Sequence, residues 1–376
     1  MKHLFLSMLI AYVVGHIYLS VRGLQLLANF PLLRWLWPAL LLVLSAAFFA
    51  GMFWGRNSGE SLALWSYHLG TAWLVPFLYL VLFALITDLL RLSNALYPWF
   101  PSLITASPYF ARVWALFGMV LIGSICGYGY YAFQNPVVTH LRLEMPAKPG
   151  APDTFTVALV SDIHLGRSVG PRSLARYVNR IEALRPDLLL LGGDVIDHGV
   201  SSLAGKGMEE ILQRLNPPYG VYAVPGNHEY YGGIEACSEW LERAGITLLR
   251  DQSVRIDSLF TVVGRDDRSA RRRKPLATLL EESGRDLPIL LLDHQPYNLT
   301  ETEQHNLFFQ FSGHTHQGQI WPVSLIVKRM YELSYGYQKR SDTHFYVSSG
   351  LALWGPPYRI GTRSEIVLLT LTFRKD

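Results

Sequence analysis

Five short segments in the second half of the chain combine carboxylate, amide and imidazole side chains with glycine or proline. Each follows an apolar run, and in chain order they are Ser161-Asp162-Ile163-His164, Gly192-Gly193-Asp194-Val195-Ile196-Asp197, Pro225-Gly226-Asn227-His228-Glu229, Asp293-His294-Gln295-Pro296 and Ser312-Gly313-His314-Thr315-His316. Carboxylate and imidazole groups together bind divalent ions such as Mn, Fe or Zn, and one carboxylate can bridge two ions because it has two oxygens. The segments therefore predict a divalent metal site.

The spacing inside these segments suits metal binding. Asp162-x-His164 and His314-x-His316 each put two ligands on one short extended or turning stretch, so both side chains can point into one crevice. Glycine precedes several of the polar residues and allows tight turns. An isolated Asp-x-His or Asn-His is usually a cap or a turn. Five such segments in succession, all after apolar runs, favour a common site.

The elements around these segments follow an alternating strand and helix pattern. Thr154 to Val160 and Leu188 to Leu191 are short apolar runs typical of buried strands, and between them apolar residues from Leu174 to Leu184 repeat at helical spacing. Such a βαβ unit indicates an α/β fold with parallel strands, whose carboxyl ends form a ligand crevice. Further strands are expected near Tyr219–Val224, Leu259–Val263, Ile289–Leu292, Leu307–Phe311, Phe345–Val347 and Ile366–Leu371, and helices near Met208–Leu215, Ile234–Ala244 and Leu276–Glu282.

The late strands follow one another without long helices between them. We therefore expect two sheets, of which the second is mainly antiparallel.

The first half of the chain is apolar and predicts membrane spans. Four stretches approach or exceed the roughly 20 residues that cross a bilayer as a helix, near Leu4–Ser20, Trp35–Trp54, Leu69–Leu90 and Val113–Phe133. A cleaved signal peptide is the rival interpretation of the first, but no small-residue cleavage pattern follows Leu19. A multi-pass protein of the cell membrane is predicted. The loops on the two sides of the predicted spans contain equal numbers of Lys and Arg residues, so these numbers do not indicate on which side of the membrane the C-terminal domain lies.

Three ionisable residues lie in or beside these stretches: His16, His68 and Asp88. We interpret His16 as a packed or hydrogen-bonded residue, and the other two as groups near span ends that reach the head groups, rather than as a proton relay.

Composition divides the 376 residues into two unlike parts, because charged residues are sparse before about position 140 and frequent after it. We predict a transmembrane region over 1–140, a Pro- and Gly-rich linker over 141–153 and a soluble domain over 154–376. A formal net charge of +4 gives no case for a nucleic-acid binder. The basic run Arg271–Lys274 is interpreted as a solvated loop or helix start, with contact to an anion as the alternative.

Taken together, Asp162-x-His164, Gly193-Asp194-x-x-Asp197, Gly226-Asn227-His228-Glu229, His294 and Gly313-His314-Thr315-His316 resemble the motifs of calcineurin-like metallophosphoesterases. The likeness runs from Thr154 to the end of the chain and is greatest to bacterial membrane-associated members. It implies a four-layer α/β/β/α sandwich, preceded here by the all-helical transmembrane region.

The resemblance also implies roles for individual residues. Asp162, His164 and His316 would hold one divalent ion, Asn227, His294 and His314 a second, and Asp194 would bridge both. His228 would act catalytically, by stabilising the transition state or protonating the leaving oxygen. Glu229 would support these groups from outside, and Asp197 would orient a ligand or cap a turn.

The implied function is hydrolysis of a phosphate ester, such as a phosphodiester, or of a phosphoanhydride. Two divalent ions, Mn, Fe or Zn, would activate a shared water for in-line attack on phosphorus. Membrane anchoring makes a lipid-linked substrate attractive. The alternative is a membrane sensor or scaffold that uses the same fold to bind a ligand without turnover.

Two further groups of polar residues lie outside these motifs. Gly264-Arg265-Asp266-Asp267 follows another predicted strand and either aims at the site or forms an Asx turn. His198, His305 and His344 have no motif around them, and we expect ordinary surface or hydrogen-bonding roles.

Overall fold

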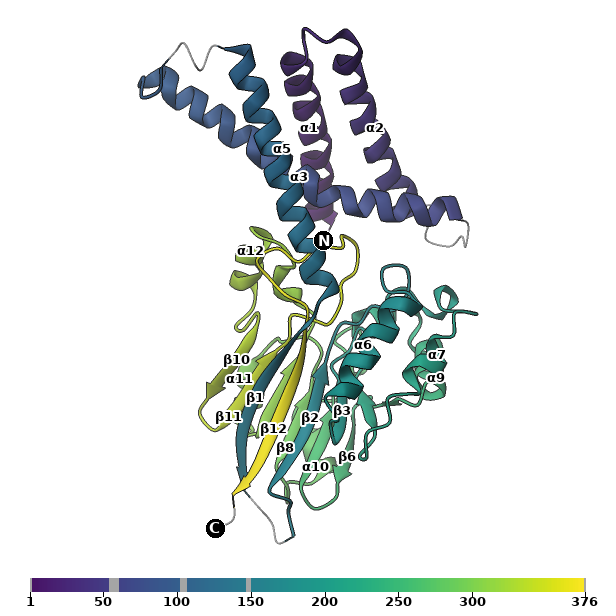
Figure 1. Ribbon diagram of the computed structural model, residues 1–376. Coiled ribbons are helices and arrows are strands. Elements are labelled where there is room, and N and C mark those ends of the chain that lie inside the picture. The colour runs from purple at the N-terminus through teal and green to yellow at the C-terminus, as the bar shows by residue number, and fades with distance from the viewer. Residues whose placement is uncertain (1, 54–60, 102–106, 147–149, 375–376) are drawn as a thin grey trace. The chain divides into compact units, whose positions relative to one another are not determined.

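The computed structural model describes residues 2–53, 61–101, 107–146 and 150–374 (Figure 1). Trp54, at the end of the second predicted span, and residues 147–149 of the predicted linker lie outside the described residues. The chain forms two compact units, the first comprising Met1–Gly129 with Gly355–Tyr358, and the second Tyr130–Trp354 with Arg359–Asp376.

The first unit is helical. Its described helices are α1 (Lys2–Leu26), α2 (Pro31–Phe53), α3 (Ser61–Leu96) and α5 (Pro108–Gln134), of which the residues from Tyr130 onward belong to the second unit. All four are long and apolar enough to cross a membrane. They coincide with the four predicted stretches, although α3 has 36 residues and extends past its predicted span at both ends.

Two ionisable side chains of these helices, those of His16 and Asp88, have partners inside the unit. His16 Nδ1 lies 2.9 Å from the carbonyl oxygen of Tyr12, and Trp73 Nε1 donates to His16 Nε2 at 3.1 Å. Asp88 accepts a hydrogen bond from Tyr18 and pairs with Arg22. The interpretation of His16 as a hydrogen-bonded residue is therefore confirmed.

The second unit contains two six-stranded sheets. The first has the order β1-β12-β2-β3-β4-β5, and its strands are β1 (Val137–Pro146), β2 (Thr154–Val160), β3 (Leu188–Leu191), β4 (Val221–Ala223), β5 (Thr247–Leu248) and β12 (Glu365–Arg374). The second has the order β10-β11-β9-β8-β7-β6, and its strands are β6 (Gln252–Ile256), β7 (Phe260–Gly264), β8 (Ile289–Leu292), β9 (Phe309–Ser312), β10 (Gly336–Arg340) and β11 (Thr343–Val347).

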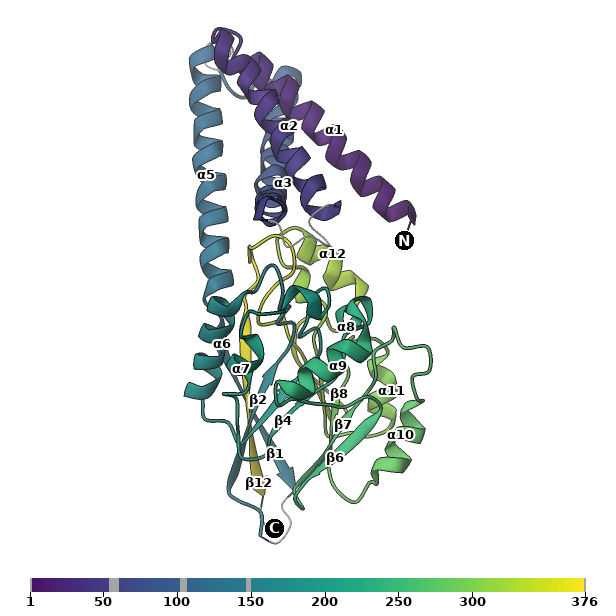
Figure 2. The same ribbon diagram turned by 90° about the vertical axis from the view of Figure 1, so that its right-hand side faces the viewer.

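Helices connect the strands. They are α6 (Pro171–Ala183), α7 (Met208–Leu212), α8 (Asn227–Gly232), α9 (Ile234–Arg243), α10 (Leu276–Ser283), α11 (Leu299–Gln304) and α12 (Val323–Met330), with 3-10 turns η1 (Val200–Ser202) and η2 (His316–Gly318). Figure 2 shows α6 and α7 on one side of the strands and α10 and α11 on the other.

Alternation along the strands explains the layers. On β2, Phe155 and Val157 belong to the apolar core between the two sheets, whereas Ala158 and Val160 belong to the core that includes α6 and α9. A third core joins α10 to the outer face of the second sheet. The predicted α/β fold and its four layers, α/β/β/α, are confirmed.

The expectation of a mainly antiparallel second sheet is wrong. Strands β7, β8, β9 and β11 are parallel neighbours, and only the edge strands β6 and β10 run antiparallel. Helices α10 and α11 return the chain between the parallel strands. The six residues of α11 are too few to give a clear helical period in the sequence.

The expected linker over 141–153 overlaps a strand. All ten residues of β1 pair in parallel with β12, from Val137 with Glu365 to Pro146 with Arg374. The partner strand lies far along the chain, so local composition gives no sign of the pairing. The division into 1–140, 141–153 and 154–376 stays a prediction, with β1 already inside the sheet.

Candidate metal centre

The polar segments follow the carboxyl ends of five strands, on loops or at the first residues of the next helix or turn. Those after β2, β3 and β4 come from the first sheet, and those after β8 and β9 from the second. Backbone hydrogen bonds join neighbouring loops: His164 N donates to Asp194 O at 3.0 Å, and Gly313 N donates to His294 O at 2.9 Å. Residues from distant parts of the sequence are thereby held at one edge.

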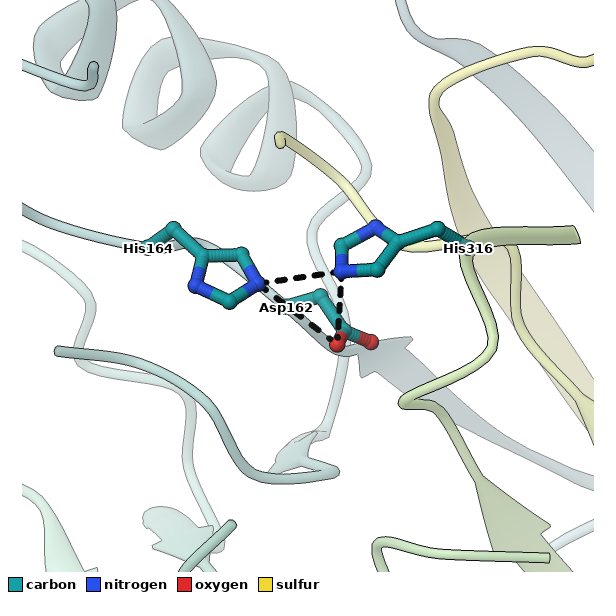
Figure 3. Close-up of side chains that lie close together, drawn as sticks. All are labelled: Asp162, His164 and His316. Carbon is teal, nitrogen blue, oxygen red and sulfur yellow. Dashed lines mark hydrogen bonds and ion pairs between the residues drawn. The ribbon is translucent and has the colours of Figure 1, made fainter. Parts of the chain in front are cut away.

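One cluster consists of Asp162, His164 and His316, all buried (Figure 3). The two imidazole Nε2 atoms are 3.1 Å apart. Asp162 Oδ1 lies 3.4 Å from Nε2 of His316 and 3.8 Å from Nε2 of His164. Two imidazole nitrogens and one carboxylate oxygen thus face a common point.

A second cluster consists of Asp194, His294 and His314. Asp194 Oδ2 lies 3.2 Å from His294 Nε2 and 4.0 Å from His164 Nε2, so one carboxylate adjoins both clusters. Asn227 Oδ1 is buried without a hydrogen-bond partner, and Asn227 lines the same cavity as Asp194 and His314.

These donor sets fit divalent cations. Each cluster offers imidazole nitrogens and carboxylate oxygen, and the amide oxygen of Asn227 lacks any protein partner that would otherwise occupy it. The structure brings together all seven residues for which the resemblance implied metal binding, and it places His228 beside them.

Close approach of the backbone makes this convergence possible. A β-carbon on Gly226 would lie 2.1 Å from Asp194 Oδ1, and one on Gly313 would lie 2.3 Å from Asp162 Oδ2. Only glycine leaves room for these two carboxylates, which explains two of the glycines in the motifs.

The histidines of the centre differ in protonation. Burial lowers the pKa of His316 to about 3 and that of His314 to about 4. Burial acts in the same direction on His164, but the carboxylates of Asp162 and Asp197 outweigh it and raise the pKa of His164 to about 10. Without a cation, the negative charge of these carboxylates is therefore balanced in part by the protonated imidazole of His164.

His228 is oriented by Asp197. Its Nδ1 lies 2.8 Å from Asp197 Oδ1 and 2.9 Å from the Asp197 carbonyl oxygen, while its Nε2 lies 4.0 Å from Asp194 Oδ2. Asp197 also approaches His164 Nδ1 at 3.5 Å and His198 Nδ1 at 2.6 Å. Asp197 thus orients imidazoles, one of the two roles expected for it.

Glu229 ties two of the loops together. Its buried carboxylate accepts hydrogen bonds from the backbone N–H groups of Asp194 at 3.1 Å, Ile196 at 2.8 Å and Gly226 at 2.7 Å. Burial and the neighbouring Asp194 raise the pKa of Glu229 to about 6. This carboxylate fixes the position of Asp194 from outside the centre.

The centre opens into a cavity of about 520 Å³. Its walls include Asp194, Asn227, His228, His314 and His316, together with the side chains of His198, Tyr231, Val323 and Trp354. His198 has the hydrogen-bonding role expected of it, but its place in the cavity wall was not predicted. Its position directly after Asp197 in the Gly-Asp motif is the signal that could have indicated it.

Arg359 also escaped prediction. Its side chain is fully buried, and its guanidinium donates to the carbonyl oxygens of His316 at 2.9 Å and Ala352 at 2.9 Å, and to those of Ser349 and Gly350. An arginine in a loop is normally exposed, so nothing in the local sequence marks it.

The Arg265-Asp266-Asp267 segment forms a turn rather than a wall of the centre. Asp267 Oδ1 accepts a hydrogen bond from Ser269 N at 2.8 Å, as in an Asx turn. Arg265 and Arg273 both pair with the buried Asp293. The interpretation of the basic run as solvated is therefore wrong for Arg273, whose side chain is only 14% exposed.

Comparison with known proteins identifies relatives of the chain. The sequence profile described as "Calcineurin-like phosphoesterase" matches residues 155–318. An uncharacterized metallophosphoesterase of Aquifex aeolicus is 31% identical over 219 residues, which are 56% of this chain and 82% of that protein. One of Helicobacter pylori is 34% identical over 221 residues, 57% of this chain and 59% of that protein.

A third relative carries a different description and matches a longer part of the chain. The "Transmembrane protein with metallophosphoesterase domain" of Danio rerio is 31% identical over 270 residues, 67% of this chain and 61% of that protein. The chain thus matches about three fifths of the length of the Helicobacter and Danio proteins.

Proposed function

The chain belongs to the calcineurin-like metallophosphoesterase family, and from this premise we propose that it is a metal-dependent hydrolase of phosphate esters or phosphoanhydrides. The observation that carries the proposal is the position of Asp194, whose Oδ2 lies within 4.0 Å of both His164 Nε2 and His294 Nε2. One carboxylate next to two donor clusters suits a pair of adjacent cations.

In this proposal Asp162, His164 and His316 bind one cation, Asn227, His294 and His314 bind the other, and Asp194 contacts both. Two divalent ions, Mn, Fe or Zn, would lower the pKa of a water and neutralise charge on the phosphoryl oxygens. His314 and His316 support the assignment because their lowered pKa values leave both imidazoles neutral at pH 7.

His228 then supplies the proton for the leaving oxygen, or stabilises charge in the transition state. Asp197 contacts Nδ1 of His228, which leaves Nε2 to act in the cavity that His228 lines. The side chain of His228 is 13% exposed. Burial opposes the positive charge, but Asp197 and Asp194 raise the pKa of His228 above its ordinary value. A raised pKa keeps the proton available near neutral pH.

We further propose that the hydrolase is a multi-pass protein of the cell membrane. The four apolar helices of the first unit support this, as does the printed description of the Danio relative. A bilayer-tethered domain meets lipid-borne groups at high effective concentration, so a lipid-linked phosphodiester or pyrophosphate is the substrate class we favour.

The test is a substrate panel with the purified full chain, paired with metal analysis. We expect about two divalent ions per chain and turnover of phosphodiesters or pyrophosphates with added Mn. Asp194→Asn should lose at least about a hundredfold in kcat, whereas Glu281→Gln, at an exposed position on α10, should match the unmodified chain. Full metal content without turnover of any phosphate ester would instead favour a sensor or scaffold.

A further inference from the structure

Helix α12 carries its apolar side chains outward. Leu325, Ile326 and Met330 are 51%, 60% and 61% exposed, while Ser324 and Val327 form the half-buried face toward the rest of the unit. No residue of the helix is buried. A surface helix of a soluble domain normally turns its apolar stripe inward, so this outer face is an exposed apolar surface that needs an explanation.

This surface continues to the mouth of the metal centre. Val323, at the start of α12, lines the same cavity as Trp354 and Tyr231, whose side chains are 46% and 70% exposed. The rings of Tyr231 and Trp354 lie 5.7 and 6.1 Å from that of His228. We call the outer face of α12 together with Trp354 and Tyr231 the apolar rim.

The rim is fixed to the metal centre by short contacts. The Tyr331 ring, directly after α12, lies 6.3 Å from that of His314, and Thr315 Oγ1 donates to Ser334 O at 2.7 Å. A β-carbon on Gly318 would lie 2.6 Å from Ser324 Cα, so the η2 turn and the helix pack backbone against backbone. Whatever covers the rim therefore lies at a fixed place relative to the donor atoms.

Charge and side-chain type indicate what covers it. The last turn of α12 contains Lys328 and Arg329, and the helix has no acidic residue. Exposed aliphatic side chains beside basic ones suit the head-group region of an anionic bilayer, where Trp and Tyr rings are also favoured. The same chain carries four helices with the length and apolarity of membrane spans, so a bilayer surface is available to it.

We propose that the apolar rim inserts into the head-group region of an anionic bilayer and presents the cavity to phosphate groups carried by lipids. The membrane contact is independent of catalysis. The lipid substrate rests on the hydrolase function proposed above.

The contact is tested on the full chain reconstituted in vesicles of phosphatidylcholine and phosphatidylglycerol. A fluorophore on Ile326→Cys should be quenched by lipids that carry a nitroxide near the head group, and one on Glu281→Cys should not. Both native cysteines, Cys126 and Cys237, are buried, so the unmodified chain serves as the labelling blank. Equal lipid quenching at the two positions would overturn the proposal. Protection of position 326 from both lipid and aqueous quenchers would also overturn it, because protein would then cover the rim.

A kinetic comparison tests the consequence for substrate. Replacing Leu325, Ile326 and Met330 by Ser should lower kcat/KM for a phosphodiester or pyrophosphate lipid in vesicles by about tenfold. The rate on a water-soluble aryl phosphodiester should not change. The matched control is Tyr337→Ser, at an exposed aromatic residue on β10 outside the rim.

The two arms separate the proposals. Quenching at position 326 without hydrolysis of any substrate would contradict the hydrolase function and leave the membrane contact standing. Hydrolysis of lipids that is unaffected by the triple substitution would contradict the role of the rim and leave the hydrolase function standing.

Discussion

Asp197 contacts three imidazoles, those of His164, His198 and His228. Because its carboxylate contributes to the raised pKa of His228, it sets the pH range in which that imidazole carries a proton. The residue is close to the centre without belonging to either cluster proposed to bind cations, so its effect should appear in the pH profile.

We predict that Asp197→Asn lowers kcat by about tenfold to a hundredfold and moves the alkaline limb of the kcat profile to lower pH. The sign follows because removing the carboxylate lowers the pKa of His228, and a proton donor is lost as pH rises through its pKa. Kinetics across the pH range provide the check. An unshifted alkaline limb would show that Asp197 does not act through His228.

The protonation of the histidines predicts pH-dependent metal binding. Without metal, His164 has its pKa raised to about 10, and the carboxylate of Asp194 overcomes burial to raise the pKa of His294 as well. A nitrogen must lose its proton to bind a cation, whereas His314 and His316 are already neutral at pH 7.

We therefore predict that loading with Mn at pH 7 releases about two protons per chain and that metal affinity rises with pH. Calorimetry in buffers of different ionisation enthalpy measures this release. Identical heats in all buffers would contradict the assignment of His164 and His294 as ligands.

At the scale of elements, Arg359 joins the η2 loop to the segment after β11. The carbonyl oxygens of His316 and Gly350 also accept hydrogen bonds from backbone N–H groups, those of Gln319 and Glu365. Those of Ser349 and Ala352 would lose the guanidinium donor if Arg359 were replaced, and unsatisfied buried carbonyls are costly. The loop that it holds includes His316.

We predict that Arg359→Met lowers the free energy of unfolding of the second unit by about 3 kcal/mol and reduces metal content. Thermal denaturation in detergent, with metal analysis of the folded fraction, gives both quantities. Arg363→Met, at an exposed position nearby, is the control and should leave both unchanged. Wild-type stability in Arg359→Met would show that water satisfies the carbonyls.

Sequence patterns predicted elements whose periodicity is complete and local. The helix at α6 has Leu174, Tyr177, Val178 and Ile181 buried on one face, at the spacing that indicated it. Parallel pairing in the second sheet was missed because α11 is so short. Helix α12 was not predicted, because its apolar residues point outward and a core-facing stripe is absent.

The convergence of the candidate metal ligands was predictable from the order of the strands, although no single loop indicated it. Taken alone, a ligand pair such as Asp162 and His164 is typical of an ordinary turn. In an α/β fold, however, the carboxyl ends of the parallel strands lie at one edge of the sheet, so the pairs are expected to meet there. Arg359 and His198 were missed because their importance comes from contacts made only in the folded chain. No rule of spacing connects Arg359 to the carbonyl of His316, 43 positions earlier.

At the scale of the whole molecule, the two units should respond differently to metal removal. The proposed cations bind only within the second unit, and a ligand present at about 100 times its dissociation constant stabilises a fold by about 2.7 kcal/mol.

We predict that a chelator lowers the melting temperature of the second unit and leaves the helices α1, α2, α3 and α5 unaffected. Near-ultraviolet and far-ultraviolet circular dichroism, followed during heating with and without Mn, would distinguish the two transitions. A uniform shift of both signals would contradict the independence of the units.

The ladder between β1 and β12 bears on how the protein is made. Strand β12 lies between β1 and β2 in the sheet, although among the described strands it comes last along the chain and therefore emerges from the ribosome after them. The sheet therefore stays open at its middle until residue 365 and those after it have emerged. By then the helices α1, α2, α3 and α5 have already emerged, so the membrane insertion proposed for them can begin before the sheet of the second unit is complete.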